Sequence, residues 1–341
     1  MAAMVASIAF AGTALLTPLS IIAARRLGVL AQPAPGTEAV HTEPAPRLGG
    51  LAIVGGAALA TALALCLIPV PPPMTHRLAA AIGIGSVLIA AVGLLDDLQQ
   101  LSWRQKLAGE IGLASGVAAV GIRIGGLHPL VGVGLAVLWL VGVTNAVNFI
   151  DGMDGLAVGV SAIAALALVS IAARVGAAHV ALLAAGLGGA CIGFLLFNFY
   201  PSKTFMGDSG SLFLGFALAA LLLALVDSPE RYSVFCAAII ALGLPISDTL
   251  SSMCRRWRHR KSMFTGDLGH YYNQLIDRFG FSQRTTALAS YGVAALLGVL
   301  ATWVAGQPLS AALAATAIVG VLLSGVVVKL GFTDYAAIMT A

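Results

Sequence analysis

Long runs of apolar residues, separated by short polar stretches, extend along the whole chain. Eleven runs have about the length that an α-helix needs to cross the hydrocarbon core of a bilayer, roughly 20 residues. They cover, approximately, residues 3–24, 49–70, 78–95, 107–123, 129–148, 156–173, 178–199, 211–226, 233–253, 286–305 and 309–330. A strand of a membrane β-barrel would be about 10 residues of alternating polarity, so these lengths exclude a barrel. The pattern predicts an all-α polytopic membrane protein with about eleven transmembrane helices.

Composition agrees with a lipid environment. Of the 341 residues, 59% are hydrophobic and only 9% are charged, whereas a soluble globular protein carries about 25% charged residues. Length alone would suggest two soluble domains, but this composition favours one integral membrane domain over residues 1–341. The four cysteines form no CxxC pair, so neither a zinc site nor a disulfide framework is predicted.

The basic residues predict the orientation of the chain. With an outer N-terminus, the eleven crossings place fourteen Lys and Arg residues inside and four outside. The outer four are Arg77, Arg123, Arg174 and Arg231. Because inner loops of membrane proteins carry an excess of Lys and Arg, we predict a multi-pass protein of the plasma (inner) membrane with a cytoplasmic C-terminus.

Most of the polar motifs fall in the loops that this orientation assigns to the inside. These loops cover residues 25–48, 96–106, 149–156, 200–211 and 254–285. The outer loops hold only two acids, Asp227 and Glu230. We therefore predict that the inner loops form a cytoplasmic active face.

Two adjacent carboxylates, Asp96 and Asp97, close the third apolar run. A plain stop signal at the membrane surface is one interpretation, although such signals are normally made with Lys or Arg. Paired acids also suit metal binding or proton abstraction, because the negative charge of one carboxylate raises the pKa of its neighbour. A DDxxD diphosphate motif is disfavoured, since Gln100 stands where its last acid would be.

A second polar group follows the fifth run. Asn145, Asn148 and Asp151 are spaced three apart, which places their side chains along one helix face, and Asp154 follows in the turn. Oxygen donors without thiols favour a hard cation such as Mg²⁺. A polar turn that merely joins two helices is the simpler alternative.

The block FMGDSGS, residues 205–211, places Asp208 where the eighth helix is expected to begin. A simple helix cap is one interpretation of an Asp at this position. The backbone N–H groups at the start of a helix also favour the binding of anions. With Lys203 nearby and glycines on both sides, we interpret the block as the place where a metal-held diphosphate rests near a helix terminus.

The last inner loop begins with a basic run, residues 255–261, in which five of seven residues are Arg or Lys. Such a run can simply anchor a helix at the inner surface or bind anionic lipid. The polar stretch that follows ends at His270 and is suited to gripping a sugar nucleotide. Two further acids, Glu110 and Asp248, lie inside apolar runs, where they are functional candidates or partners of a neighbouring helix.

Together and in this order, the motifs resemble those of the polyprenyl-phosphate N-acetylhexosamine-1-phosphate transferase family, glycosyltransferase family 4. The likeness covers about residues 41–285. Its elements are a proline-to-double-glycine entry into the second helix at 44–50, Asp96-Asp97 with Lys106, NxxNxxDGxxGL at 145–156, FMGDSGS at 205–211, and P-x-x-D at Pro245 to Asp248.

The last loop departs from the family pattern D-x-x-H-x-H-H-x-L. Asp267, His270 and Leu275 fit it, but Tyr272 and Asn273 replace the paired histidines. The spacing of Asp267 and His270 resembles the undecaprenyl-phosphate GlcNAc-1-phosphate transferases more than the phospho-MurNAc-pentapeptide transferases. The exact sugar is therefore left open.

The resemblance implies an enzyme that transfers a sugar 1-phosphate, most simply GlcNAc-1-phosphate, from a UDP-N-acetylhexosamine to polyprenyl (undecaprenyl) phosphate and releases UMP. This would be a first membrane step of cell-envelope polysaccharide or glycan synthesis. The other implied partner is the lipid bilayer; no nucleic acid is expected, and a homodimer is left open.

The resemblance also implies roles for individual residues. Mg²⁺, or Mn²⁺ in its place, would bind Asp208 and Asn148. Asp96 is the candidate for deprotonating or orienting the lipid phosphate and Asp97 for supporting Asp96 or the metal, with these two roles interchangeable. Substrate binding is expected from Lys106, Asn145, Asp151, Asp154, Arg258, Arg260 and His270. Direct attack by the lipid phosphate and an aspartyl intermediate both remain open.

Two alternative functions compete with this one. A phospho-MurNAc-pentapeptide transferase of peptidoglycan synthesis is the nearer, and a secondary transporter or flippase belongs to a different class. A transporter should gather its acids near mid-bilayer and show an internal repeat. Here the acids lie at one rim and no repeat is evident, so the transferase is favoured. A non-catalytic homologue that binds lipid or nucleotide is a smaller alternative.

Overall fold

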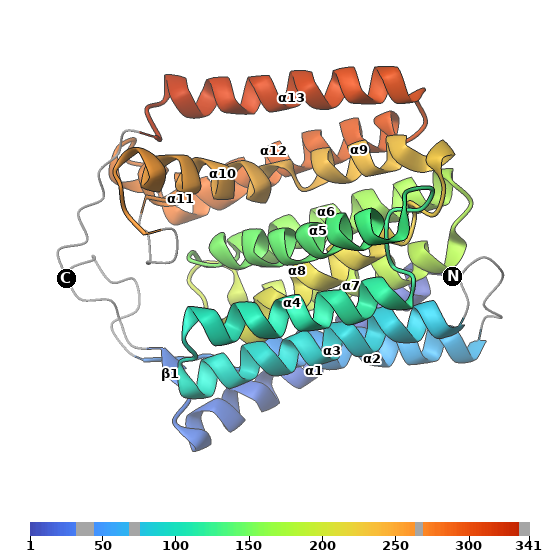
Figure 1. The fold of residues 1–341 in the computed structure, drawn as a ribbon. Helices are drawn as coiled ribbons and strands as arrows, with labels where there is room; N and C mark the ends of the chain where they lie inside the picture. The colour runs from blue at the N-terminus through green and yellow to red at the C-terminus, as the bar shows by residue number, and fades with distance from the viewer. Residues whose placement is uncertain (32–43, 68–75, 263–268, 334–341) are drawn as a thin grey trace.

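The computed structural model describes residues 1–31, 44–67, 76–262 and 269–333. Thirteen α-helices are found within this part of the chain, and the long ones lie side by side in one bundle (Figure 1). They are α1 (Ala2–Leu27), α2 (Gly49–Leu67), α3 (His76–Gln99), α4 (Trp103–Val120), α5 (Pro129–Phe149), α6 (Leu156–Arg174), α7 (Ala178–Asn198), α8 (Gly207–Leu223), α9 (Tyr232–Ala241), α10 (Gly243–Arg258), α11 (Tyr271–Asp277), α12 (Gln283–Val304) and α13 (Leu309–Lys329).

The prediction of an all-α polytopic membrane protein is confirmed. Each of the eleven apolar runs coincides with a helix, or in the ninth run with a pair of helices. In the described part, seven helices are long and apolar enough to cross a membrane, and the pair α9–α10 makes an eighth if it is counted as one span. The helices α2 and α8 are apolar but shorter, while α4 holds Arg104, Lys106 and Glu110 within 18 residues. The total of eleven spans therefore stays a prediction.

The ninth run differs most from its expected form. Its two helices are bent by 67° with respect to each other at a break around Leu242. Two smaller features were also not anticipated, namely the short helix α11 and an antiparallel pairing of the two-residue strands β1 (Leu30–Ala31) and β2 (Ala45–Pro46).

Helix α8 lies in the middle of the bundle, where every one of its residues except Asp208 is buried. It packs against α3 and α5 and also contacts α2, α6 and α7. The approach of α3 depends on Gly93, because a Cβ atom there would lie 2.3 Å from the carbonyl oxygen of Asp208. This close crossing brings the C-terminal end of α3 to the N-terminal end of α8.

We expect Gly93→Ala to destabilise the protein by about 1–3 kcal/mol, because α3 must move away from the backbone of α8. Gly83→Ala is the matched control, since a Cβ atom at that position on the same helix meets nothing within 4 Å. The control should leave the protein unchanged or stabilise it by up to about 1 kcal/mol, the helix propensity difference between Gly and Ala. Thermal unfolding in detergent measures both, and equal melting temperatures for the two variants would contradict this description of the crossing.

The five loops that were assigned to the inside meet at one end of the bundle, as far as they are described. Contacts between loops join them there: the Phe205 N–H donates to the Pro46 carbonyl (2.8 Å), and the Tyr272 hydroxyl to the Phe149 carbonyl (3.4 Å). In Figure 1 this is the end that carries β1 and α11. Residues 32–43 and 263–268, which include His41 and Asp267, lie outside the described residues.

Candidate active site

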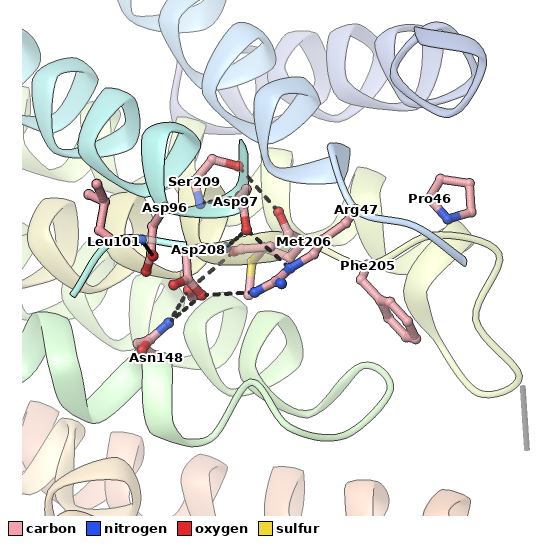
Figure 2. Close-up of polar contacts among 12 residues, drawn as sticks. Pro46, Arg47, Asp96, Asp97, Leu101, Asn148, Phe205, Met206, Asp208 and Ser209 are labelled. Carbon is pink, nitrogen blue, oxygen red and sulfur yellow. Dashed lines mark hydrogen bonds and ion pairs between the residues drawn. The ribbon is translucent and has the colours of Figure 1, made fainter. Parts of the chain in front are cut away.

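The site lies where α3 ends and α8 begins. Asp96 and Asp97 occupy the last turn of α3, Asp208 the first turn of α8, and Asn148 the last turn of α5. Figure 2 shows these side chains pointing toward one another. Residues from three helices that are far apart in the sequence thus form one polar cluster at the end of an apolar bundle.

Lys106 enters this cluster from the first turn of α4. Ser102 caps that helix, because its side chain accepts a hydrogen bond from the Gln105 N–H in a capping box. The Lys106 ammonium lies 2.5 Å from Asp208 Oδ2, 3.1 Å from Asp96 Oδ2 and 3.5 Å from Asn148 Oδ1. It is therefore surrounded by three side-chain oxygens from three different helices.

Asp97 is the most constrained member of the cluster. Its carboxylate accepts hydrogen bonds from the backbone N–H groups of Asp208 (2.9 Å) and Ser209 (3.0 Å) and pairs with Arg47 Nε (3.1 Å). The Asp97 side chain is fully buried, whereas that of Asp96 is 14% exposed. Asp97 thus ties α3 to the start of α8, and Asp96 is the more accessible of the two acids.

Arg47 is a site residue to which the sequence analysis gave no role. Besides pairing with Asp97, it places Nη2 3.5 Å from Asp208 Oδ1 (Figure 2). Strand β2 holds it there, because the Pro46 carbonyl accepts a hydrogen bond from the Phe205 N–H at 2.8 Å. The only signal in the sequence was its place beside the double glycine that opens the second helix.

The donor set fits a hard divalent cation. Side-chain oxygens of Asp96, Asn148 and Asp208 converge on one point. The positively charged Lys106 ammonium lies at this point in the structure. Among the described residues there is no group of three or more His, Cys, Asp or Glu side chains that could hold a metal ion. This finding is compatible with Mg²⁺, which is usually held by one or two carboxylates together with substrate phosphates.

Asn145 lies one helical turn deeper than Asn148 and faces a different partner. Its side-chain amide donates to Glu110 Oε2 and to the Val141 carbonyl. Glu110 is 1% exposed. Asn145, which the sequence analysis assigned to substrate binding, and Glu110, which it left between two interpretations, therefore join α4 to α5 beneath the cluster.

Asp151 and Asp154 occupy the turn between α5 and α6 and behave differently. Burial, followed by the charge of Asp208, raises the pKa of Asp151 well above its ordinary value. Asp154 is buried and accepts hydrogen bonds from the backbone N–H and the hydroxyl of Ser202, both at 2.9 Å. Asp154 therefore fixes the 200–206 loop, which leads into Asp208, while Asp151 stays available beside the cluster.

The remaining predicted residues lie apart from the acidic cluster. His270 is buried beside Phe149, with their ring centroids 5.9 Å apart, and it pairs with Asp248. Arg258 and Arg260 are exposed near the C-terminal end of α10. Within the described part of the chain, neither of these arginines contacts Asp96, Asp97 or Asp208.

Fold and site together define a class: a polytopic membrane protein whose acidic and basic side chains converge at one rim of an apolar bundle. Comparison with known proteins makes the class specific. Residues 79–226 match the model of glycosyl transferase family 4. A probable undecaprenyl-phosphate N-acetylglucosaminyl 1-phosphate transferase of Bacillus subtilis is 35% identical over 298 residues, which cover 84% of this chain and 80% of the relative.

Two other relatives represent the two branches that the sequence left in competition. A decaprenyl-phosphate N-acetylglucosaminephosphotransferase of Mycobacterium tuberculosis is 34% identical over 79% of this chain and 74% of its own length. A phospho-N-acetylmuramoyl-pentapeptide-transferase of Desulforudis audaxviator is 30% identical over 86% of this chain and 95% of its own length. The chain belongs to glycosyl transferase family 4, the family of polyprenyl-phosphate N-acetylhexosamine-1-phosphate transferases.

Proposed function

We propose that the protein transfers N-acetylglucosamine 1-phosphate from a UDP-sugar to a polyprenyl phosphate and releases UMP, in a reaction that depends on Mg²⁺. The observation that carries this proposal is the cluster of Asp96, Asp208, Lys106 and Arg47 at the rim of an apolar bundle. The polyprenyl tail of a carrier lipid can lie against the apolar helices there. Its phosphate then lies at the polar end of the bundle, where a soluble donor can bind. The N-acetylglucosaminyl relatives from Bacillus subtilis and Mycobacterium tuberculosis support the choice of sugar.

The two cations of the cluster suit the binding of phosphate groups. Lys106 carries a point charge, and Arg47 a planar group that can hold two phosphate oxygens at once. The Arg47 side chain is 39% exposed even though it pairs with Asp97, so it can also meet a ligand from outside. We assign both residues to the diphosphate of the donor and the phosphate of the carrier lipid.

The two adjacent acids suit different roles. Asp97 is fully buried, and its oxygens are already engaged by two backbone N–H groups and Arg47, which suits a structural role. Asp96 is partly exposed, accepts a hydrogen bond from the Leu101 N–H (2.8 Å), pairs with Lys106 and lies within hydrogen-bond reach of Asp208. We assign Asp96 to deprotonating or orienting the lipid phosphate, and Asp97 to holding the first turn of α8 in place.

Asp208 and Asn148, with Asp96 at their side, would hold Mg²⁺, and the bound ion would stabilise the negative charge that develops on the diphosphate. The Asn148 amide donates to Asp208 Oδ1 at 3.1 Å and to Ser211 Oγ at 2.8 Å, which fixes both groups. Asp151 and His270 would position the nucleotide and the sugar. Arg258, at the end of α10, and Arg260, just after it, would reach the donor.

A panel of donors tests this proposal. Purified protein is incubated with polyprenyl phosphate, Mg²⁺ and either UDP-N-acetylglucosamine, other UDP-N-acetylhexosamines or UDP-MurNAc-pentapeptide, and UMP is measured. We expect UMP release with UDP-N-acetylglucosamine that requires the lipid. Release with the muramyl donor alone would identify the peptidoglycan enzyme instead, and no release with any donor would contradict the transferase proposal.

The native cysteines test the proposed location of the site on the cytoplasmic face of the plasma membrane. Cys254, at the site end of the bundle, and Cys66, near the opposite end, are exposed, whereas Cys191 and Cys236 are buried. We expect a membrane-impermeant maleimide to label Cys66 in right-side-out vesicles and Cys254 in inverted vesicles. Mass spectrometry of the labelled peptides reads both sites, and the opposite pattern would place the active face outside.

A further inference from the structure

Asp248, a buried carboxylate with no role so far, forms a pair with the imidazole of His270. Asp248 of α10 is 3% exposed and His270 is 6% exposed, and Asp248 Oδ2 lies 2.6 Å from His270 Nδ1. The other carboxylate oxygen, Oδ1, accepts a hydrogen bond from the Tyr271 N–H at 2.9 Å. Both oxygens of Asp248 therefore face groups of the segment that carries His270.

Aromatic rings pack against the His270 imidazole, in addition to its hydrogen bond with Asp248. It stacks on Tyr272 with the two rings 1° from parallel and their centroids 5.6 Å apart, and it lies next to Phe149. Tyr272 is fixed in turn, because its hydroxyl donates to the Phe149 carbonyl at the C-terminal end of α5. Phe149 directly follows Asn148 in the chain, so these contacts tie the ring to the end of α5 that carries Asn148.

These contacts decide which ring nitrogen carries the proton when the imidazole is neutral. A carboxylate can only accept, so Nδ1 must be the N–H donor to Asp248, and Nε2 is left with a lone pair. Ser252 Oγ lies 3.4 Å from Nδ1, much farther than Asp248 Oδ2 at 2.6 Å, so the carboxylate is the partner that determines the tautomer. In the described part of the chain, Nε2 has no hydrogen-bond partner.

We propose that Asp248 is a positioning residue that keeps the proton of His270 on Nδ1, so that Nε2 accepts a hydrogen bond from an O–H or N–H group of the donor sugar. A lone pair cannot bind a phosphate oxygen, which is itself an acceptor, so the sugar and not the diphosphate is the part that His270 recognises. The proposal rests on the proposed function for the identity of this ligand, but not for the state of the ring.

Asp248→Asn tests the proposal because it keeps the size and shape of the side chain and changes which nitrogen of His270 carries the ring proton. The Tyr271 N–H can only donate, so it claims the single oxygen of the new amide. The amide nitrogen then faces Nδ1 with a hydrogen, which forces Nδ1 to be the acceptor and moves the ring proton to Nε2. In this variant His270 Nε2 is a hydrogen-bond donor toward the sugar, whereas in the wild type it is an acceptor.

The first measurement is the tautomer itself, read from ¹⁵N spectra of histidine-labelled protein in nanodiscs, with the His270 signals assigned from His270→Gln. We expect the Nδ1–H form in the wild type and the Nε2–H form in Asp248→Asn. Ser252→Ala is the matched control, since it removes the other neighbour of Nδ1 and should leave the Nδ1–H form in place. An Nε2–H form in the wild type, or no change in Asp248→Asn, would overturn the proposal.

The second measurement is kinetic. Asp248→Asn should lower kcat/KM for the sugar nucleotide by about 10- to 100-fold, as expected when a buried hydrogen bond is replaced by two facing donors, and leave the KM for the carrier lipid unchanged. Asp248→Asn combined with His270→Ala should be no worse than His270→Ala alone, because Asp248 acts through the imidazole. Additive losses would show that Asp248 has a merely structural role. A wild-type protein that turns over no donor would refute the proposed function, while the spectra would still decide the state of the ring.

Discussion

Asp208→Asn is expected to lower turnover by at least about 10³-fold, which corresponds to about 4 kcal/mol of transition-state stabilisation. The carboxylate meets Lys106, Asn148 and Arg47, and it is the group around which the other members of the cluster are arranged. An amide in its place keeps the volume but removes the charge that would hold Mg²⁺ beside the diphosphate. Steady-state UMP release in detergent or nanodiscs measures the effect.

A binding measurement separates loss of the metal from loss of the fold. In the wild type, Mg²⁺ should raise the melting temperature in a concentration-dependent way, because the ion binds only the folded site. Asp208→Asn should keep a cooperative unfolding transition and lose this dependence. Asp227→Asn, an exposed acid at the opposite end of the bundle that pairs with Arg231, is the control and should retain it. Wild-type turnover in Asp208→Asn would remove Asp208 from the metal site.

The adjacent acids should give opposite results when each is changed to Asn. Asp96→Asn is expected to lower kcat by about 10²–10⁴-fold, the usual contribution of a positioned general base, with little change in stability, because the Asn oxygen can still accept from the Leu101 N–H. Asp97→Asn is expected to lower the free energy of unfolding by about 3 kcal/mol, because a buried carboxylate with three donors loses its charge. Thermal unfolding and initial rates on both variants measure the two effects.

The split between the two acids is the informative result. A stable, inactive Asp96→Asn beside a destabilised Asp97→Asn would assign the chemistry to Asp96 and the attachment of α3 to Asp97. If Asp97→Asn unfolds at the wild-type temperature and Asp96→Asn keeps its activity, the roles are interchanged, which the sequence alone allowed.

Most of the helices could be predicted from the sequence because a bilayer imposes a length. An apolar run of about 20 residues has few alternatives to a helix in lipid, since every backbone group must be satisfied within the segment. The exception is instructive. The run 233–253 has the length of one span, so its length gave no sign of the break at Leu242. The local signal was Gly243 and Pro245, two residues that suit the start of a new helix better than the middle of an old one.

The sequence predicted which residues belong to the site better than it predicted which of them contact one another. Asp96, Asn148 and Asp208 stood out because charged and amide groups are rare in a chain with 9% charged residues. The pairing of Arg47 with Asp97 depends on the attachment of β2 to the 200–206 loop and on the crossing at Gly93, which local patterns do not encode. The pairing of Asp248 with His270 likewise requires the fold, because two isolated polar residues in different segments show no common spacing.

The central claim is that the bond broken lies within the diphosphate, so that the sugar leaves with its own phosphate. Purified protein incubated with polyprenyl phosphate, Mg²⁺ and UDP-N-acetylglucosamine labelled with ³²P in the β-phosphate tests it most directly. The account predicts that the label moves into the lipid phase and that unlabelled UMP appears in equal amount. Label that remains in the aqueous phase as UDP, with sugar transferred to the lipid, would show cleavage at the sugar carbon and contradict the account.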